Sequence, residues 1–143
     1  VTKGSFYWHF KDRAALHEAM LDQWRSGATQ AIIARLEASG GDARGKLRRL
    51  IDMTARNKDA ARLETAMRGW ARVERKVGDA IAAADRARVA YVAGLLRAMG
   101  VKAGLAEVRA RILYLALIGS YFSAGASVPA GRDLWREIEA LIA

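Results

Sequence analysis

The sequence predicts an all-α protein, and three observations support this fold class. Among 143 residues there are 13 glycines but a single proline, Pro129, while alanine, leucine and arginine, which favour helix, are abundant. Apolar residues recur at three- and four-residue spacing, as on one face of an amphipathic helix. The alternation of apolar and polar residues that marks a half-buried strand is not visible. With 52% apolar residues, the chain is long enough to bury the core of one domain, or of one domain plus part of another.

The first half of the chain divides into helices at capping residues and glycines. Thr2 suits the N-cap of a short helix that runs to about His9, and Asp12 suits the N-cap of a longer one. The longer helix ends at Gly40–Gly41, because glycine adopts the left-handed conformation that closes a helix. Asp42 starts the next helix, whose apolar face is formed by Leu47, Leu50, Ile51 and Thr54. The longer helix carries its core candidates at helical spacing: Leu16, Met20, Trp24, Ile32 and Leu36.

The second half continues with helices of increasing apolar content. We expect a fourth helix over about residues 61–75 and a fifth over about 77–99, closed by Gly100. Residues 109–124 form a helix with almost no polar face, and such a helix must be covered on both sides. The last helix begins near Pro129, a residue suited to a first helical turn. The apolar residues of the fourth helix are Leu63, Met67 and Trp70, and those of the last are Leu134, Trp135, Ile138, Leu141 and Ile142.

Basic residues are concentrated in the middle of the chain. The net charge is +9, and residues 44–76 hold eleven Lys and Arg against four Asp and Glu, a net of +7. Such an excess suits an anionic partner, but it equally suits the solvated faces of arginine-rich helices. Arginines of this segment also suit an acidic ligand, although Glu64 and Arg68 are four residues apart and so can pair on a helix surface. Charge alone therefore leaves the kind of partner open.

Composition excludes several classes of site. The chain has no cysteine, so it forms neither a disulfide nor a thiolate metal site. Its two histidines, His9 and His17, leave little for an imidazole metal site, and we expect no metal and no cofactor. Because a paired-carboxylate motif, a nucleophile turn and a phosphate-binding loop are all missing, we do not expect an enzyme. The longest apolar run, residues 112–122, is too short to span a bilayer and has no signal-peptide flank, so we expect a cytoplasmic protein without a membrane partner.

The first residues place aromatic rings beside basic side chains. On a helical wheel Phe6 and Phe10, four residues apart, fall on one face and suit a core. A glycine inside a helix costs about 1 kcal/mol relative to alanine, and close approach of another molecule would explain Gly4 on the other face. Tyrosine and tryptophan there can donate hydrogen bonds to sugar and phosphate, and Lys3 with the amides of the helix start suits phosphate. This outward face consists of Gly4, Ser5, Tyr7 and Trp8.

Residues 2–16, TKGSFYWHFKDRAAL, resemble the recognition helix and the start of the following helix in the TetR family of bacterial transcription regulators. The later stretches ETAMRGWARVERKV, ADRARVAYVAGLLRAMG and RARILYLALIGSYFSAG resemble the ligand-binding and dimerisation helices of that family more loosely. The resemblance is therefore sharp at the start of the chain and general afterwards. The positions that meet the family pattern are Thr2, Lys3, Gly4, Phe6, Tyr7, Trp8, His9, Phe10, Asp12, Arg13 and Leu16.

The resemblance implies a TetR-like helical fold in two parts. Residues 1–27 would be the C-terminal part of a helix-turn-helix DNA-binding domain, and residues 28–143 a helical effector-binding and dimerisation domain. The family has two helices before the recognition helix, and the sequence starts after them, so we expect Phe6 and Phe10 to need those helices for burial and this chain alone not to bind an operator. The residues that the resemblance places at DNA are Thr2, Lys3, Gly4 and Ser5 in the major groove, Tyr7 and Trp8 on bases or backbone, and His9, Lys11 and Arg13 on phosphates.

The function implied is that of a DNA-binding transcriptional regulator, a repressor that binds a palindromic operator as a homodimer and is released by a small-molecule effector. Methionine and aromatic side chains suit an adaptable effector pocket, but at helical spacing they equally suit a plain core. The helix over 109–124 and the last helix would pair with the same helices of a second copy. The candidate effector residues are Trp24, Met53, Met67, Trp70, Tyr91, Leu95, Tyr114 and Leu117. The candidate interface residues are Ile112, Leu115, Ile118, Tyr121, Phe122, Leu134, Trp135, Ile138 and Ile142.

The alternative function is that of a helical small-molecule-binding or scaffold protein that does not bind DNA. The basic middle segment would then serve solubility or an acidic partner. Sequence-specific, salt-dependent binding to DNA distinguishes the two classes.

Overall fold

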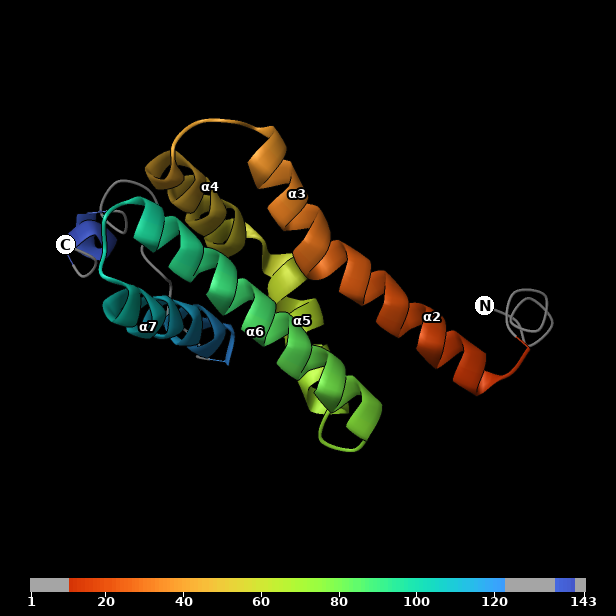
Figure 1. Ribbon diagram of the computed structural model, residues 1–143. Helices are drawn as coiled ribbons and strands as arrows, with labels where there is room; N and C mark the ends of the chain where they lie inside the picture. The colour runs from red at the N-terminus through yellow and green to blue at the C-terminus, as the bar shows by residue number, and fades with distance from the viewer. Residues whose placement is uncertain (1–10, 123–135, 141–143) are drawn as a thin grey trace.

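The computed structural model describes residues 11–122 and 136–140, and these are helical apart from short turns. No strand occurs in those two ranges, so the prediction of an all-α fold is confirmed. The helix predicted over residues 2–9 and the predicted start of the last helix at Pro129 lie outside the described residues. The elements in chain order are α2 (Arg13–Arg25), the π-helical turn η1 (Ser26–Gln30), α3 (Ala31–Ala38), α4 (Ala43–Arg56), α5 (Lys58–Trp70), α6 (Arg75–Ala98), α7 (Ala103–Phe122) and a helical stretch over 136–140 (Figure 1).

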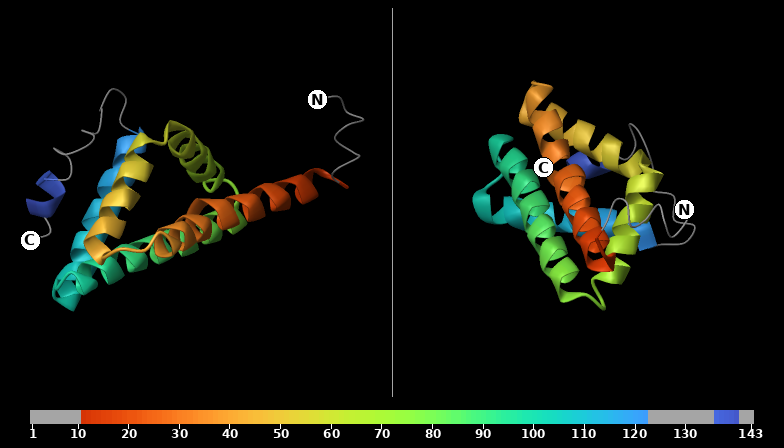
Figure 2. Two further views of the ribbon diagram at one scale, coloured as in Figure 1. Left: turned by 90° about the horizontal axis from the view of Figure 1, so that it is seen from above. Right: turned by 90° about the vertical axis from the view of Figure 1, so that its right-hand side faces the viewer.

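The segments α2, η1 and α3 form one continuous rod, whose first turns project beyond the other helices (Figures 1 and 2). Asp12 caps the start as predicted, because its side chain accepts a hydrogen bond from the backbone N–H of Ala15 at 2.8 Å. The rod ends at the predicted glycine pair, with φ of 64° at Gly40 and 86° at Gly41. The π-helical turn inside the rod was not predicted. Helical torsions continue through both of its flanking residues.

Local capping signals place most of the other boundaries. Asp42 caps α4, and Gly100, with φ of 93°, follows the end of α6, both as predicted. The helix expected over 61–75 is α5, which begins earlier because the side chain of Asn57 caps it. That helix ends at Trp70, and the last residue of its predicted range already belongs to α6. Compared with the predicted range, α5 begins three residues earlier and ends five residues earlier.

Two apolar clusters pack along α6. The α2-side cluster joins α2, α5 and the first half of α6, and the α7-side cluster joins α4, the second half of α6, α7 and residues 136–140. Met20, predicted for the core, is 49% exposed, whereas its neighbour Leu21 is 2% exposed, because α2 packs on α6 through its Leu21 and Trp24 edge. Leu63 is likewise exposed. The α2-side cluster comprises Leu21, Trp24, Met67, Val77, Ala80 and Ile81, and the α7-side cluster Leu47, Val92, Ala93, Leu95, Leu96, Ala106, Ala110 and Ile138.

Among the described residues, the helix α7 is covered on one side only. It begins at Ala103, before the predicted start at residue 109, and its residues Ala106 and Ala110 pack without any exposed surface in the α7-side cluster. The opposite side is exposed along the length of the helix, although we expected cover on both sides. This exposed side, the α7 apolar face, consists of Leu105, Val108, Ile112, Leu115 and Phe122.

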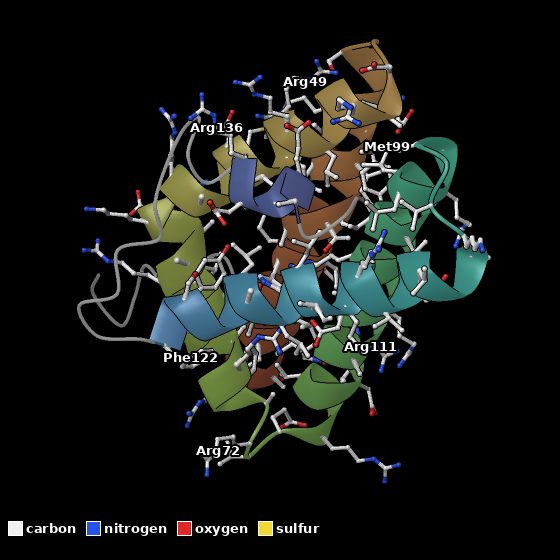
Figure 3. All side chains as sticks on the ribbon, turned by 90° about the vertical axis from the view of Figure 1, so that its left-hand side faces the viewer. Arg49, Arg72, Met99, Arg111, Phe122 and Arg136 are labelled. Atoms are coloured by element: carbon white, nitrogen blue, oxygen red, sulfur yellow. The ribbon has the colours of Figure 1, made fainter. Side chains whose placement is uncertain are left out.

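Residues 136–140 lie against α4 and α7 (Figure 3). Ile138, which we expected at the interface between two copies, is instead 7% exposed in the α7-side cluster of its own chain. Arg44 of α4 donates a hydrogen bond to Glu139 of the same stretch. Both contacts bind this stretch to its own bundle, which leaves Ile138 almost no surface for a partner.

Replacing Leu96 with alanine tests the packing of the α7-side cluster. Leu96 has 0% exposure, so Leu96→Ala leaves a cavity, and we expect the free energy of unfolding to fall by about 2–5 kcal/mol. The matched control is Leu63→Ala on α5, with a side chain 49% exposed, which we expect to cost less than about 1 kcal/mol. Urea denaturation followed by circular dichroism measures both variants. Equal losses would contradict this placement of Leu96.

Candidate functional site

Most of the residues that the resemblance places at DNA lie outside the described residues, at positions 1–10. Lys11 and Arg13 are described, and both are exposed at the start of α2. The guanidinium of Arg13 donates to Nε2 of His17 at 3.4 Å, one turn further along the helix. The residues outside the described ranges are Thr2, Lys3, Gly4, Ser5, Tyr7, Trp8 and His9.

The first turns of α2 are attached to the corner between α5 and α6. The rings of His17 and Trp70 meet edge to face, with their centroids 5.0 Å apart. Glu18 accepts a hydrogen bond from Nζ of Lys76 at 2.5 Å. These two contacts join α2 to the α5–α6 corner.

A partly buried group of polar side chains lies along α6 between the two apolar clusters. We call it the polar centre, and its acidic member on α5, Glu64, is 5% exposed. Arg88 of α6 donates to both oxygens of Glu64, at 3.0 Å and 3.2 Å, and Arg68 donates to the same carboxylate at 3.0 Å. Charge-assisted, bidentate hydrogen bonds of this kind are stronger than those between neutral groups. The polar centre comprises Thr29, Glu64, Arg68, Asp85, Arg88 and Tyr114.

A second carboxylate completes the charge balance of the polar centre. Asp85 of α6 accepts from two nitrogens of Arg68, at 2.6 Å and 3.2 Å, and from the hydroxyl of Tyr114 at 2.5 Å. Arg68 and Arg88 both donate to the Tyr114 oxygen, at 2.9 Å and 3.2 Å. Burial and the hydrogen bond to Asp85 raise the pKa of Tyr114, so its hydroxyl keeps its proton near neutral pH and acts as a donor. Two cations thus face two anions, with a phenol between them.

Arg88 also contacts the α2–α3 rod. Its Nε donates to Oγ1 of Thr29 at 2.9 Å, and one of its terminal nitrogens donates to the backbone carbonyl of Ala28 at 3.3 Å. Its guanidinium lies 5.5 Å from the centre of the Trp24 ring, a cation–π distance. One side chain of α6 therefore binds α2, η1, α5 and α7 together.

The predicted effector residues do not line one common cavity in the structure. Trp24 and Met67 are buried in the α2-side cluster with Trp70 against it, whereas Leu95 is buried in the α7-side cluster with Tyr91 against it. Among the rest, Tyr114 belongs to the polar centre, Met53 borders a hollow at the α4–α5 corner, and Leu117 is half-buried on α7.

Two open hollows lie on the surface of the described bundle. The larger, of about 690 Å³, lies at the α4–α5 corner and is lined by charged and polar residues around Met53. The smaller, of about 410 Å³, lies between α5 and the end of α7, and we call it the α5–α7 hollow. Burial and the negative charge of Glu64 raise the pKa of Tyr121 in its wall, so this hollow adjoins the polar centre. The α5–α7 hollow is lined by Ala61, Arg62, Thr65, Ala66 and Tyr121.

Much of the basic middle segment is ion-paired within the chain. Lys46 binds Glu37, and the exposed Arg62 lies 3.5 Å from Asp59. Such exposed pairs add little to stability. The pairing favours solvated helix faces, the plainer of the two interpretations of this segment, over an anion-binding patch.

Sequence reasoning found the pairing of Glu64 with Arg68 but placed it on the surface. It missed Asp85 and Arg88, which with the exposed Arg86 are the charged residues of an alanine-rich stretch of α6. A charged residue on the packed side of a helix needs a partner, because burial of an unpaired charge is costly. The partner of Arg88, 24 positions away in α5, is not readable from local spacing.

No described helix is long and apolar enough to cross a membrane. Within residues 11–122 and 136–140, no group of three His, Asp or Glu side chains is close enough to hold a metal ion. The polar centre is therefore the site of interest in the described part of the chain.

Removing the charge of Glu64 tests the polar centre. Glu64→Gln keeps the size of the side chain but leaves two arginines to share one carboxylate, so we expect the free energy of unfolding to fall by about 3–5 kcal/mol. The control is Asp59→Asn, in the exposed pair with Arg62, for which we expect a change within about 0.5 kcal/mol.

A double-mutant cycle measures the pairing directly. Chemical denaturation of Glu64→Gln, Arg88→Met and the double variant gives the coupling free energy, which for a buried contact of this kind is expected to be about 1–3 kcal/mol. A coupling free energy near zero would show that the two side chains do not depend on each other.

Comparisons with known protein families, with curated protein sequences and with solved structures found no match to this chain. The function has to be argued from the first residues of the sequence, the polar centre and the α7 apolar face.

Proposed function

We propose that this chain belongs to a TetR-like transcriptional repressor that binds a palindromic DNA operator as a homodimer and releases it when a small molecule binds. The observation that carries the proposal is the direct connection between residues 2–16 and the interior of the bundle. The residues that resemble a recognition helix directly precede Asp12, the N-cap of α2, in the sequence. From there a single rod leads to Arg88 at Thr29. A change in the interior can therefore pass along this helical rod to Arg13, the proposed DNA-binding residue at the start of α2.

The α5–α7 hollow supports the effector part of the proposal. Its volume of about 410 Å³ lies within the range of about 300–1,000 Å³ that is usual for small-molecule sites. Its lining combines two alanines with three polar side chains, those of Arg62, Thr65 and Tyr121. Glu64 is the sequence neighbour of Thr65 in that lining, and its charge acts on Tyr121 in the same wall.

The α7 apolar face supports the homodimer part of the proposal. Its five large side chains are each about half exposed or more, and they follow one another at three-, four- and seven-residue spacing. A stripe with this spacing suits packing against another helix. Figure 3 shows α7 at the front of the bundle, with Phe122 at one end and Arg111 further along. A two-fold axis beside this helix would cover the face in both copies.

DNA binding is tested with the complete protein and substitutions in its first residues. Lys3→Ala and Tyr7→Phe remove a proposed phosphate contact and a proposed hydroxyl contact, and we expect each to weaken operator binding by about tenfold, or 1.4 kcal/mol. The melting temperature should change little. The control is Lys102→Ala, an exposed lysine just before α7.

The measurement is fluorescence anisotropy on sequences selected from random DNA, at several salt concentrations. We expect the affinity to fall steeply with salt, because phosphate contacts release counterions. If no sequence is preferred over random DNA, the DNA-binding proposal fails and a helical small-molecule-binding protein becomes the better interpretation.

A charge on the α7 apolar face tests the dimer. Leu115→Arg places a cation in the proposed interface, and we expect a shift from dimer to monomer or aggregate in sedimentation equilibrium. The matched control is Val73→Arg at the α5–α6 corner, where the side chain is 84% exposed and far from that face along the chain. A dimer that persists with Leu115→Arg would place the interface elsewhere.

A further inference from the structure

The turn η1 interrupts a regular helical rod at the place where Arg88 contacts it. Within η1 the backbone N–H of Ala31 bonds to the carbonyl of Ser26, five residues back rather than four. Turns of this kind are rare in helices and are frequently found at functional sites. A π-helical turn in the middle of the rod therefore needs interactions that hold it.

The residues of η1 themselves favour no helical form strongly. Its sequence, SGATQ, contains Gly27, a poor helix former. The hydroxyl of Ser26 donates to the carbonyls of Asp22 at 3.0 Å and Gln23 at 3.2 Å, an arrangement that bends helices. A Cβ added at Gly27 would meet no atom within 4 Å, so packing at this position does not impose the turn.

Arg88 supplies contacts that hold η1. It donates to the Thr29 hydroxyl at 2.9 Å and to the Ala28 carbonyl at 3.3 Å, and Thr29 is only 7% exposed. The same guanidinium is oriented by both oxygens of Glu64. The form of η1 is thus tied to a pair of charges on α5 and α6.

We propose that η1 is a two-state turn and that Arg88 is the positioning residue that keeps it π-helical. When Arg88 leaves Thr29 and Ala28, the turn returns to α-helical bonding. An α-helical residue turns the chain by about 100°, and a wider π-helical turn rotates it by less per residue. The change therefore rotates α2 about its own axis relative to α3 and α6. Side chains extend on the order of 5 Å from the helix axis, so those of α2 move by a few ångströms.

The rotation reaches whatever precedes α2 in the chain. Residues 1–10 would then be presented to DNA at a different angle, a consequence that rests on the proposed function, whereas the two-state turn itself does not. A ligand in the α5–α7 hollow would act on the turn through Glu64, because this carboxylate orients Arg88.

The test uses two variants that favour the α-helical form by independent routes. Thr29→Val removes the hydroxyl that accepts from Arg88 and keeps the buried shape. Gly27→Ala raises the helix propensity of the turn without touching the polar centre. The matched control is Gly69→Ala in α5, where an added Cβ also meets nothing within 4 Å.

The readout is the distance between spin labels on α2 and α6 in the complete protein. These 143 residues contain no cysteine, so Ala19→Cys and Ala82→Cys, at exposed positions, give specific labels once any cysteine elsewhere in the complete protein is replaced by serine. We expect both turn variants to shift the distance distribution by about 3–5 Å and to slow or speed amide exchange at residues 26–31. The Gly69→Ala control should reproduce the parent distribution.

The outcomes separate the turn from DNA binding. If Gly27→Ala and every folded Thr29→Val sample keep the parent distance and exchange rates, the two-state turn is wrong. A shifted distance in a protein that prefers no DNA sequence supports the turn and contradicts the proposed function. If the variants keep the label distance of the parent protein while the protein binds an operator, the two-state turn is contradicted and the proposed function is supported.

Discussion

Arg88 and Glu64 meet where the two apolar clusters of the bundle adjoin, and there Glu64 is almost completely removed from water. A charge in such a place costs several kcal/mol of desolvation, and only a close partner with further hydrogen bonds offsets that cost. The position of α5 on α6 is consequently restricted to arrangements that keep the two side chains in contact. The same guanidinium binds η1 and Tyr114, so the restriction extends to the α2–α3 rod and to α7.

Apolar packing alone would leave more freedom. The two apolar clusters consist of hydrophobic side chains on helical surfaces, and such cores tolerate hydrophobic replacements if volume and patterning are conserved. The polar centre lacks that tolerance, because Arg68 and Arg88 must each find a carboxylate at hydrogen-bonding distance. Hydrophobic replacement of a buried ion pair is often neutral or stabilising. The Glu64–Arg88 pair therefore matters more for fixing the arrangement of the helices than for the free energy of unfolding.

Local chemistry explains which parts of this fold were predictable. Asp12 and Asp42 cap helices through bonds to backbone N–H groups a few residues away, and Gly40–Gly41 end one with torsions that other residues avoid. These signals are short in sequence, so they were read correctly, and the all-α class with them. The exposure of Met20 beside a buried Leu21 was not readable, because it depends on how α2 turns against α6.

The candidate site was less predictable than the fold for the same reason. Arg88 bonds to Thr29, 59 residues away in the sequence, and to Glu64, 24 residues away. Contacts over such separations produce no periodic pattern in the sequence. Tyr114 was singled out as an aromatic residue, but its value lies in a hydroxyl that bonds Asp85. The π-helical turn has no sequence rule of its own. It follows from a tertiary contact, and its sequence merely permits it.

The proposed regulation has a physical basis in the shortness of the contacts at Arg88. Glu64 stands beside the lining of the α5–α7 hollow, and on its other side it holds Arg88 at about the optimal hydrogen-bond length. Such bonds weaken steeply once the partners separate or misalign, whereas apolar contacts in the neighbouring clusters change little over the same displacement. A ligand that moves α5 slightly therefore acts on the polar centre far more than on the clusters. Since the contacts to Thr29 and Ala28 use the same guanidinium, the displacement is passed to η1 and to α2 without disturbing the core.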